Sequence, residues 1–260
     1  MLAGVVFVSR AAGQVAPNRA VAYLHPTDVQ DARALWVSPA GLGVSREASV
    51  HLDVTVDRPG AAGRLRQVTL GFNSRGLSFG YQRDVFDGGV RGHTYRLGLA
   101  GRSEALAAGV ATAYYRGDTE ATTGWDVGVL YRAGSPLAVG SVISNLGQPV
   151  VRGVRQRVTY VPGATVRPFG PQAAFSVHGR FTSDQVLRYS FGMRWSWGTR
   201  LPVELAARLD TDHAFRRAAF AFGLSAGRQD VLGVILTTPG DVTTVDAASL
   251  YGLASRRMAR

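Results

Sequence analysis

Residues 186–197 show the clearest alternation of apolar and polar side chains in the sequence. One parity is entirely apolar: Leu187, Tyr189, Phe191, Met193, Trp195 and Trp197. The other parity is polar or small: Arg188, Ser190, Gly192, Arg194 and Ser196. A strand that crosses a bilayer needs about 9–11 residues and turns one apolar face to lipid, with aromatic residues near the interface. The pattern therefore predicts a membrane-spanning β-strand whose lipid-facing aromatics are Tyr189, Phe191, Trp195 and Trp197.

Similar alternation continues from residue 48 to the end of the chain. Regular segments lie at 50–56, 67–72, 77–82, 95–100, 125–132, 175–181, 203–210 and 217–224, and less regular ones at 105–116, 137–144, 154–166, 230–237 and 243–255. With residues 186–197 they make roughly fourteen strands, and an even number from 12 to 14 suits a bacterial barrel. Closure would remove the two unpaired edges of an open sheet. We expect an all-β, transmembrane, antiparallel up-and-down barrel.

The connections between these segments alternate in length. Residues 57–64, 84–91, 117–123 and 145–153 form long connections, whereas 73–75, 101–104 and 133–136 are short. Outer-membrane barrels have long external loops and short periplasmic turns. A soluble β-sandwich or surface adhesin, the remaining alternative, has no reason to alternate in this way, and folding in water without detergent would support it.

The N-terminal region differs from the rest. Residues 1–13 combine a short apolar run with the small residues Ala11, Ala12 and Gly13, which indicates a truncated signal peptide, although an ordinary N-terminus would also fit. Residues 14–47 lack strand alternation. Thr27 or Asp28 is a candidate cap for a short helix reaching Trp36. We expect residues 14–47 to form a plug or hatch and residues 48–260 to form the barrel.

The polar parity of the strands predicts what faces the lumen. It carries seven basic candidates, which are Arg96, Arg132, Arg180, Arg188, Arg194, Arg208 and Arg217. It also carries Asp53, Asp126, Glu204 and Asp210. Two interpretations stay open. The charges either form ion pairs that fill the interior, or they line a cationic path for anionic or amphipathic solutes such as carboxylates.

Composition narrows the class of protein. The chain has 260 residues, a net charge of +11, 29 basic residues that are all Arg, and no Cys. Codon usage of a GC-rich genome would explain the arginines, and so would affinity for anions such as lipopolysaccharide phosphates. Because the arginines are spread along the strands, we expect no nucleic-acid partner. The absence of Cys excludes disulfides and thiolate metal sites.

Enzymatic motifs receive little support. Residues 223–227 match Gly-x-Ser-x-Gly, but Ser225 follows a strand with no helical pattern after it, so the match is best explained by chance. The five His residues at 25, 51, 93, 178 and 213 are scattered, without metal-ligand spacing. We expect a non-enzyme with no metal or cofactor.

Two short motifs carry a family resemblance. Residues 32–44 contain Ser38, Pro39, Ala40, Gly41 and Leu42 before the first strand, and residues 143–147 read Ile-Ser-Asn-Leu-Gly. They resemble the FadL/PorV-type outer-membrane barrels, whose signature is Asn-Pro-Ala-Gly-Leu, with Ser38 in place of Asn. The resemblance implies fourteen strands, a plug that turns at residues 38–42, and a location in the bacterial outer membrane.

The resemblance also implies two functions. FadL-like members pass hydrophobic molecules, so we expect transport or binding of a small hydrophobic or amphipathic molecule. PorV-like members serve a secretion machine, and a further set resembles the barrel that precedes S49 signal-peptide-peptidase-like protease domains. The alternative is therefore a non-transporting anchor or scaffold with an envelope protein partner. The last strand has no C-terminal aromatic residue, which is compatible with a fragment of a longer protein.

Overall fold

The structure, a computed structural model, describes residues 18–57, 64–86, 91–117, 121–134, 136–216, 218–238 and 245–257. The signal-peptide prediction for residues 1–13 lies outside these ranges, and so does Arg217. None of the helices in the described ranges has the length and apolar character of a transmembrane helix.

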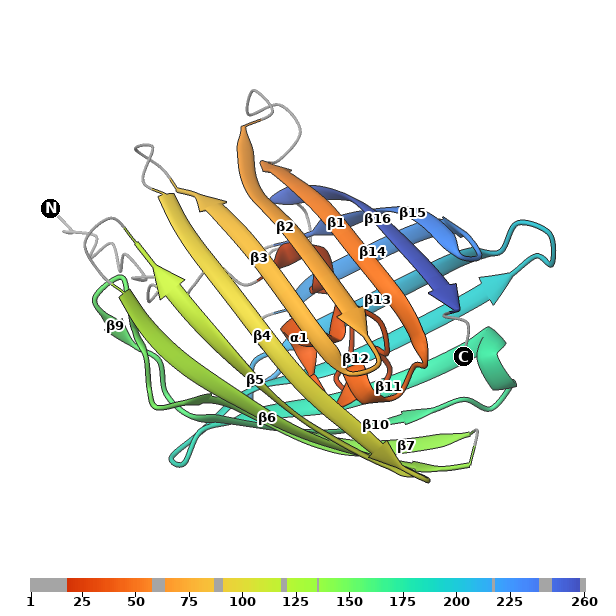
Figure 1. The fold of residues 1–260 in the computed structure, drawn as a ribbon, viewed down its shortest axis with the longest axis horizontal. Coiled ribbons are helices and arrows are strands. Elements are labelled where there is room, and N and C mark those ends of the chain that lie inside the picture. The colour runs from red at the N-terminus through yellow and green to blue at the C-terminus, as the bar shows by residue number, and fades with distance from the viewer. Residues whose placement is uncertain are drawn as a thin grey trace, which may run out of the picture.

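The described strands confirm the predicted architecture. Fourteen of them form one closed sheet in which each pairs with its sequence neighbours antiparallel and β16 closes on β1 (Figure 1). The short strands β8 (Val150–Val151) and β9 (Val154–Arg155) form a separate two-stranded sheet, and the residues of β9 face the lumen cavity described below. The barrel strands are β1 (Glu47–Asp57), β2 (Leu65–Ser74), β3 (Leu77–Val85), β4 (Arg91–Ser103), β5 (Leu106–Arg116), β6 (Ala121–Ala133), β7 (Leu137–Leu146), β10 (Thr159–Val166), β11 (Ala173–Phe181), β12 (Val186–Trp197), β13 (Val203–Thr211), β14 (Ala218–Gly227), β15 (Asp230–Thr237) and β16 (Ala247–Arg257).

The two ends of the barrel differ in their connections. We call the end where β1, β3, β5, β7, β11, β13 and β15 finish the long-loop end, and the other the short-turn end. The connection from β7 to β10 carries the β8–β9 hairpin, whereas residues 75–76 alone join β2 to β3. The contrast is weaker beyond residue 166, where η4 (Gly170–Gln172) occupies a turn of the short-turn end.

The N-terminal residues lie inside the barrel. Residues 18–44, which we call the inner segment, contain η1 (Arg19–Val21), α1 (Ala34–Val37) and η2 (Pro39–Gly43) and are seen behind β1–β4 (Figure 1). The segment starts at the long-loop end, where the Arg19 guanidinium lies 3.2 Å from the Asp246 carboxylate, and leads into β1 at the short-turn end. The chain therefore crosses the lumen once before it builds the wall.

Helix α1 begins further along the chain than the cap candidates Thr27 and Asp28 predict. Helix α1 starts at Ala34 and has no side-chain cap. Instead of capping, the hydroxyl of Thr27 bonds that of Thr165 on β10 at 2.6 Å, and Asp28 binds arginines of the wall. The prediction that Thr27 or Asp28 caps this helix was wrong, because partners on the wall compete for both side chains.

Glycines on the lumen face make room for the inner segment. At seven strand positions a Cβ atom would meet atoms of that segment: Gly71, Gly80, Gly98, Gly109, Gly128, Gly192 and Gly223. At Gly98, for example, a Cβ would lie 2.7 Å from a methyl carbon of Leu35 and 2.8 Å from one of Leu42. Both leucines are almost wholly buried. At Gly80, Gly98, Gly109 and Gly192 a Cβ would come closer than 3.0 Å to the inner segment, so the wall and the segment are packed too closely there for a larger side chain.

The apolar parity of the strands points outward. Phe191, Trp195 and Trp197 are 41%, 40% and 48% exposed. Tyr189 is half-buried because its ring stacks on that of Phe215, with the ring centroids 5.7 Å apart. Leu187 does not follow the predicted pattern. The register between β11 and β12 shifts at Arg180/Phe181, so Val186 rather than Leu187 pairs with Phe181, and Leu187 lines an internal cavity.

Candidate functional site

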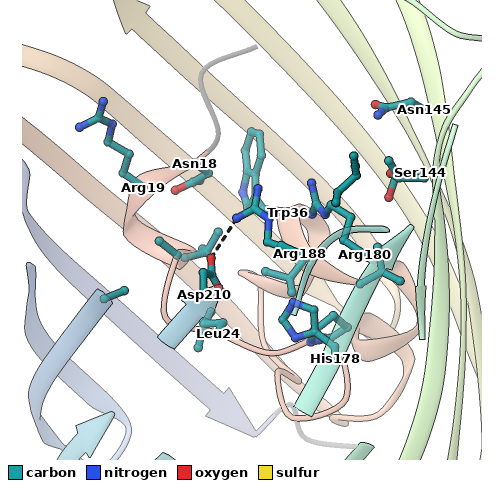
Figure 2. A pocket seen from close by; sticks show the side chains of 18 of the residues that line it. Asn18, Arg19, Leu24, Trp36, Ser144, Asn145, His178, Arg180, Arg188 and Asp210 are labelled. Atoms are coloured by element: carbon teal, nitrogen blue, oxygen red, sulfur yellow. Dashed lines mark hydrogen bonds and ion pairs between the residues drawn. The ribbon is translucent and has the colours of Figure 1, made fainter. Parts of the chain in front are cut away.

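A cavity of about 710 Å³ occupies the long-loop half of the lumen (Figure 2). Its floor is the inner segment, which contributes mainly apolar side chains: Val21, Ala22, Leu24, Pro26, Trp36 and Val37. Its wall carries the basic side chains Arg96, Arg180, Arg188 and Arg208 together with Asp126 and Asp210. The cavity is therefore apolar on one side and positively charged on the other.

Arg96 is held in place on the wall. Its guanidinium forms an ion pair with Asp126 on β6 and lies 5.4 Å from the centre of the Trp36 ring. Asp126 also accepts a hydrogen bond from the backbone N–H of Asn145 at 2.9 Å. Strand β4, strand β6 and the inner segment are thereby linked beside the cavity, and the charge of Arg96 is neutralised.

Arg188 and Arg208 share one carboxylate. The Asp210 carboxylate lies 2.9 Å from Arg188 Nη1 and 2.7 Å from Arg208 Nε. Arg208 also donates to the backbone carbonyl of Leu24 at 2.9 Å. Two cations against one anion leave an excess positive charge at this part of the cavity.

Arg180 differs from these three arginines. It points into the cavity from β11 (Figure 2), and within the described part of the chain it has no ion-pair partner. Its Nε is buried without a hydrogen-bond partner among those residues. A buried guanidinium without a counter-ion favours an anion or a polar acceptor beside it.

The short-turn half of the lumen contains a different arrangement of charges. Asp28 of the inner segment lies 2.5 Å from Arg167 Nη2 and 2.8 Å from Arg194 Nε, and Arg194 lies 3.2 Å from Glu204. Burial opposes the charge of Asp28, but the two guanidinium groups outweigh it and hold the pKa of this carboxyl at about 2. These ion pairs fasten the inner segment to β12 and to the residue that follows β10, and Arg194 links the site on to Glu204 of β13.

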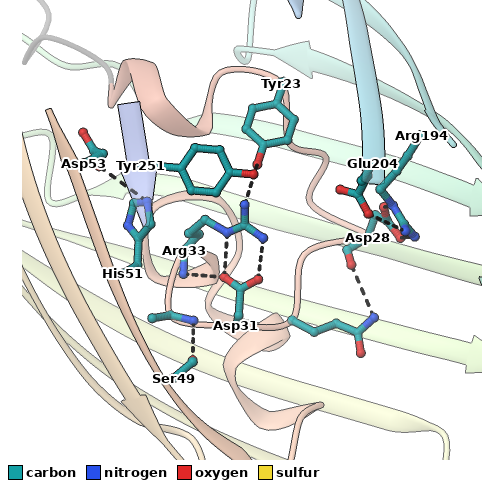
Figure 3. A network of polar contacts seen from close by, with 12 residues as sticks. Tyr23, Asp28, Asp31, Arg33, Ser49, His51, Asp53, Arg194, Glu204 and Tyr251 are labelled. Carbon is teal, nitrogen blue, oxygen red and sulfur yellow. Dashed lines mark hydrogen bonds and ion pairs between the residues drawn. The ribbon is translucent and has the colours of Figure 1, made fainter. Parts of the chain in front are cut away.

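A second polar network fastens the inner segment at the seam between β1 and β16 (Figure 3). Arg33 binds Asp31 through two nitrogens, at 2.9 and 2.7 Å, and donates to the hydroxyl of Tyr23. That hydroxyl lies 3.2 Å from the hydroxyl of Tyr251 on β16. Burial opposes the charge of Asp31 and Arg33 outweighs it, so the pKa of the Asp31 carboxyl lies below its usual value.

Two histidines that the sequence did not connect lie in contact. The Nδ1 atoms of His25, in the inner segment, and His178, on β11, are 2.9 Å apart. A Cβ at Gly192 would overlap the His25 ring, so the glycine is what admits the imidazole. Burial and then the nearby Arg208 lower the pKa of His25 to about 3. The histidines are scattered in the sequence, and the fold brings these two together although residue 25 lies far from β11 along the chain.

The remaining candidates are placed as follows. Ser38 is buried just before η2, which holds the other four residues of the turn at 38–42, all buried. The carbonyl of Leu42 accepts from Asn73 at 3.3 Å. Arg132 is half-buried, and its Nε and Nη2 are buried without a hydrogen-bond partner in the described ranges. Ser225 lies within β14, which runs on to Gly227 and is followed by β15. No cluster of three or more metal-ligating residues is found in the described part of the chain.

The comparisons with known proteins establish the fold. No family model matches the chain, and no curated protein matches it. CymD, a monoaromatic hydrocarbon channel, is 12% identical with a TM-score of 0.59, over 89% of this chain and 94% of that one. TbuX, the Ralstonia pickettii toluene transporter, is 11% identical with a TM-score of 0.61, over 91% and 98%.

A third structure, TodX, the Pseudomonas putida toluene transporter, is 10% identical with a TM-score of 0.55, over 90% of this chain and 96% of that one. Likeness at such low identity concerns architecture alone. The FadL-type barrel fold that residues 38–42 and 143–147 indicated is confirmed. The likeness to barrels that precede S49 protease domains stays a prediction from the sequence.

Proposed function

We propose that this chain is a channel of the bacterial outer membrane that binds and passes a small hydrophobic or amphipathic molecule. The observation that carries the proposal is the cavity of about 710 Å³ between the inner segment and the long-loop end. Its volume is in the range of cavities that hold small ligands. The channels for monoaromatic hydrocarbons that share the fold support the same class of solute.

The lining of the cavity suggests which part of the solute lies where. An apolar body would lie against Leu24, Trp36 and Val37 of the inner segment. A polar or anionic group would lie toward Arg180, whose Nε has no partner among the described residues. Apolar contacts would supply most of the affinity, and the guanidinium would orient the molecule.

The inner segment acts as the plug in this proposal. It fills the short-turn half of the lumen, and the ion pairs of Asp28 connect it to Arg194 on β12 and to Arg167, directly after β10. Passage therefore requires the segment to move or to leave a path beside it. The proposal gives the chain no catalytic role and no cofactor.

Trp36 provides a direct test of binding. It lines the cavity, whereas Trp125, Trp195 and Trp197 are exposed on the outer face, so a ligand in the cavity should change the emission of Trp36 alone. We expect saturable changes with toluene and with benzoate in detergent-solubilised chain, and none in the Trp36→Phe variant.

Transport is tested by uptake of labelled toluene and benzoate into Gram-negative cells that express the chain or an empty vector. Faster uptake with the chain would support the channel. Absence of both the Trp36 signal and the faster uptake would contradict the proposal and would leave the non-transporting anchor or scaffold as the better description.

A further inference from the structure

Three neighbouring strands carry an ordered set of outward-facing side chains at the long-loop end. The register of β3, β4 and β5 aligns Tyr81 with Tyr95 and Tyr95 with Tyr114, which we call the tyrosine row. One step nearer the long loops, it aligns Arg83 with His93 and His93 with Arg116, which we call the cationic row.

The rows share the outward parity of their strands. Tyr95 and Tyr114 are 37% and 43% exposed. Toward the middle of the barrel the same faces continue with exposed apolar side chains: Leu77, Phe79, Leu97, Leu99 and Val110. Because side chains on one face repeat every second residue, the cationic row lies about 7 Å along the strands from the tyrosine row.

The tyrosine row is packed as a unit. Ring centroids of Tyr81 and Tyr95 are 5.2 Å apart, and those of Tyr95 and Tyr114 are 6.3 Å apart. The hydroxyl of Tyr81 lies 2.8 Å from His93 Nδ1, which joins the tyrosine row to the cationic row. Tyrosines gather at the boundary between the hydrocarbon and the headgroups of a membrane.

The cationic row has no counter-ion among the residues that the structure describes. Neither Arg83 nor Arg116 forms an ion pair with any described residue, and Arg83 Nε is buried without a hydrogen-bond partner among them. On the adjacent strand the situation differs, because Arg66 lies 2.7 Å from the Asp57 carboxylate. Adjacent strands are about 4.8 Å apart, so Arg83 and Arg116 flank a site about 10 Å wide with His93 at its centre.

We propose that the cationic row binds the phosphate of an anionic lipid whose acyl chains lie along the apolar rows below it. The order of aliphatic, tyrosine and cationic rows matches the order of acyl chain, interface and headgroup phosphate in a leaflet. Guanidinium groups bind phosphate oxygens through paired charge-assisted hydrogen bonds. The inference rests on the proposed placement in a membrane and does not require that the chain transports anything.

Lipid binding to the detergent-solubilised chain, measured by native mass spectrometry, tests the proposal. The probes are phosphatidic acid and phosphatidylcholine with the same acyl chains. We expect phosphatidic acid to bind at least about tenfold more tightly, and the Arg83→Gln, Arg116→Gln double variant to lose that preference. The matched control is Arg46→Gln, Arg200→Gln, which removes the same charge from exposed positions at the short-turn end and should keep the preference.

Three results would overturn the proposal. The first is that the double variant keeps the preference for phosphatidic acid. The second is that the control loses the preference equally, which would show only an effect of net charge. The third is that excess inorganic phosphate displaces the lipid, which would show a site for free phosphate. A gel shift on boiling checks that each variant is folded. The Trp36 signal with toluene and benzoate should persist in the double variant, so failure of this site and failure of the channel are distinguishable.

Discussion

The two halves of the lumen use the same residue type for opposite purposes. In the short-turn half, Arg167 and Arg194 are bound to Asp28, and the inner segment fills the space. In the long-loop half, Arg180 has no partner in the described part of the chain, and a cavity lies beside it. Arginine on a lumen face therefore anchors the inner segment where the segment brings a carboxylate, and lines a cavity where the segment brings apolar side chains.

The largest expected effect comes from removing the carboxylate that anchors the inner segment in the short-turn half, Asp28. Asp28→Ala leaves Arg167 without its ion-pair partner and Arg194 with Glu204 alone, and a broken buried ion pair costs about 3–5 kcal/mol. We expect residues 18–44 to lose protection in hydrogen exchange by that amount. In the matched control, Asp184→Ala, the lost pair with Arg157 is exposed to solvent and should leave the protection of residues 18–44 unchanged. Equal effects of the two variants would contradict the comparison.

Close packing between wall and inner segment gives the next effect. Gly98→Leu places a side chain where a Cβ alone would lie 2.7 Å from Leu35, and overpacking of this kind costs about 1–3 kcal/mol. We expect higher conductance in planar bilayers because the inner segment is displaced. Gly101→Leu is the control on the same strand, since a Cβ there meets nothing within 4 Å. Unchanged conductance with Gly98→Leu would show that the segment does not close the lumen.

Acid should loosen the inner segment. The pKa of His25 is about 3 in the folded chain against an ordinary 6.5, so below pH 6.5 the released segment takes up a proton that the docked one does not. The pKa of Asp28 is about 2 against an ordinary 3.8, so its stabilising ion pairs are lost as the pH falls from about 4 toward 2. Each group contributes at most about 1.4 kcal/mol per pH unit.

Hydrogen exchange of residues 18–44 between pH 7 and pH 4 measures this dependence. His25→Asn should flatten it, whereas His213→Asn, which changes an exposed histidine in the connection after β13, should leave it unaltered. If the hydrogen-exchange protection of residues 18–44 in the unmodified chain stays constant as the pH is lowered from 7 to 4, His25 accepts a proton without leaving its site.

The smallest expected effect is on ligand binding in the cavity of the long-loop half, and it comes from replacing Arg180. Arg180→Leu should weaken benzoate binding about tenfold, as expected for the loss of one charge-assisted hydrogen bond, without altering protection of the inner segment. Toluene binding should change little because toluene has no charged group. Arg180→Lys, which keeps the charge, should restore part of the benzoate affinity. A matching loss for toluene would mean that Arg180 only shapes the cavity.

Alternation along the chain determined the barrel, its fourteen strands and the faces of most side chains. Successive side chains of a strand point to opposite faces, so the polarity of each residue reports whether it faces lipid or the lumen. The placement of Arg96, Arg188, Arg194 and Arg208 on the lumen side followed from the same periodicity. The polar parity also holds Gly71, Gly80, Gly98, Gly128, Gly192 and Gly223, and in the structure each of these glycines faces the inner segment.

Only the tertiary structure decided which of these charges are paired. Asp28 meets Arg194 across 166 positions of sequence and His25 meets His178 across 153, and no local pattern encodes such distant contacts. A one-residue shift of register at Arg180/Phe181 turned Leu187 inward, which periodicity cannot anticipate. Side-chain direction is a property of the local backbone, whereas charge pairing and cavity formation depend on what the closed barrel brings opposite each residue.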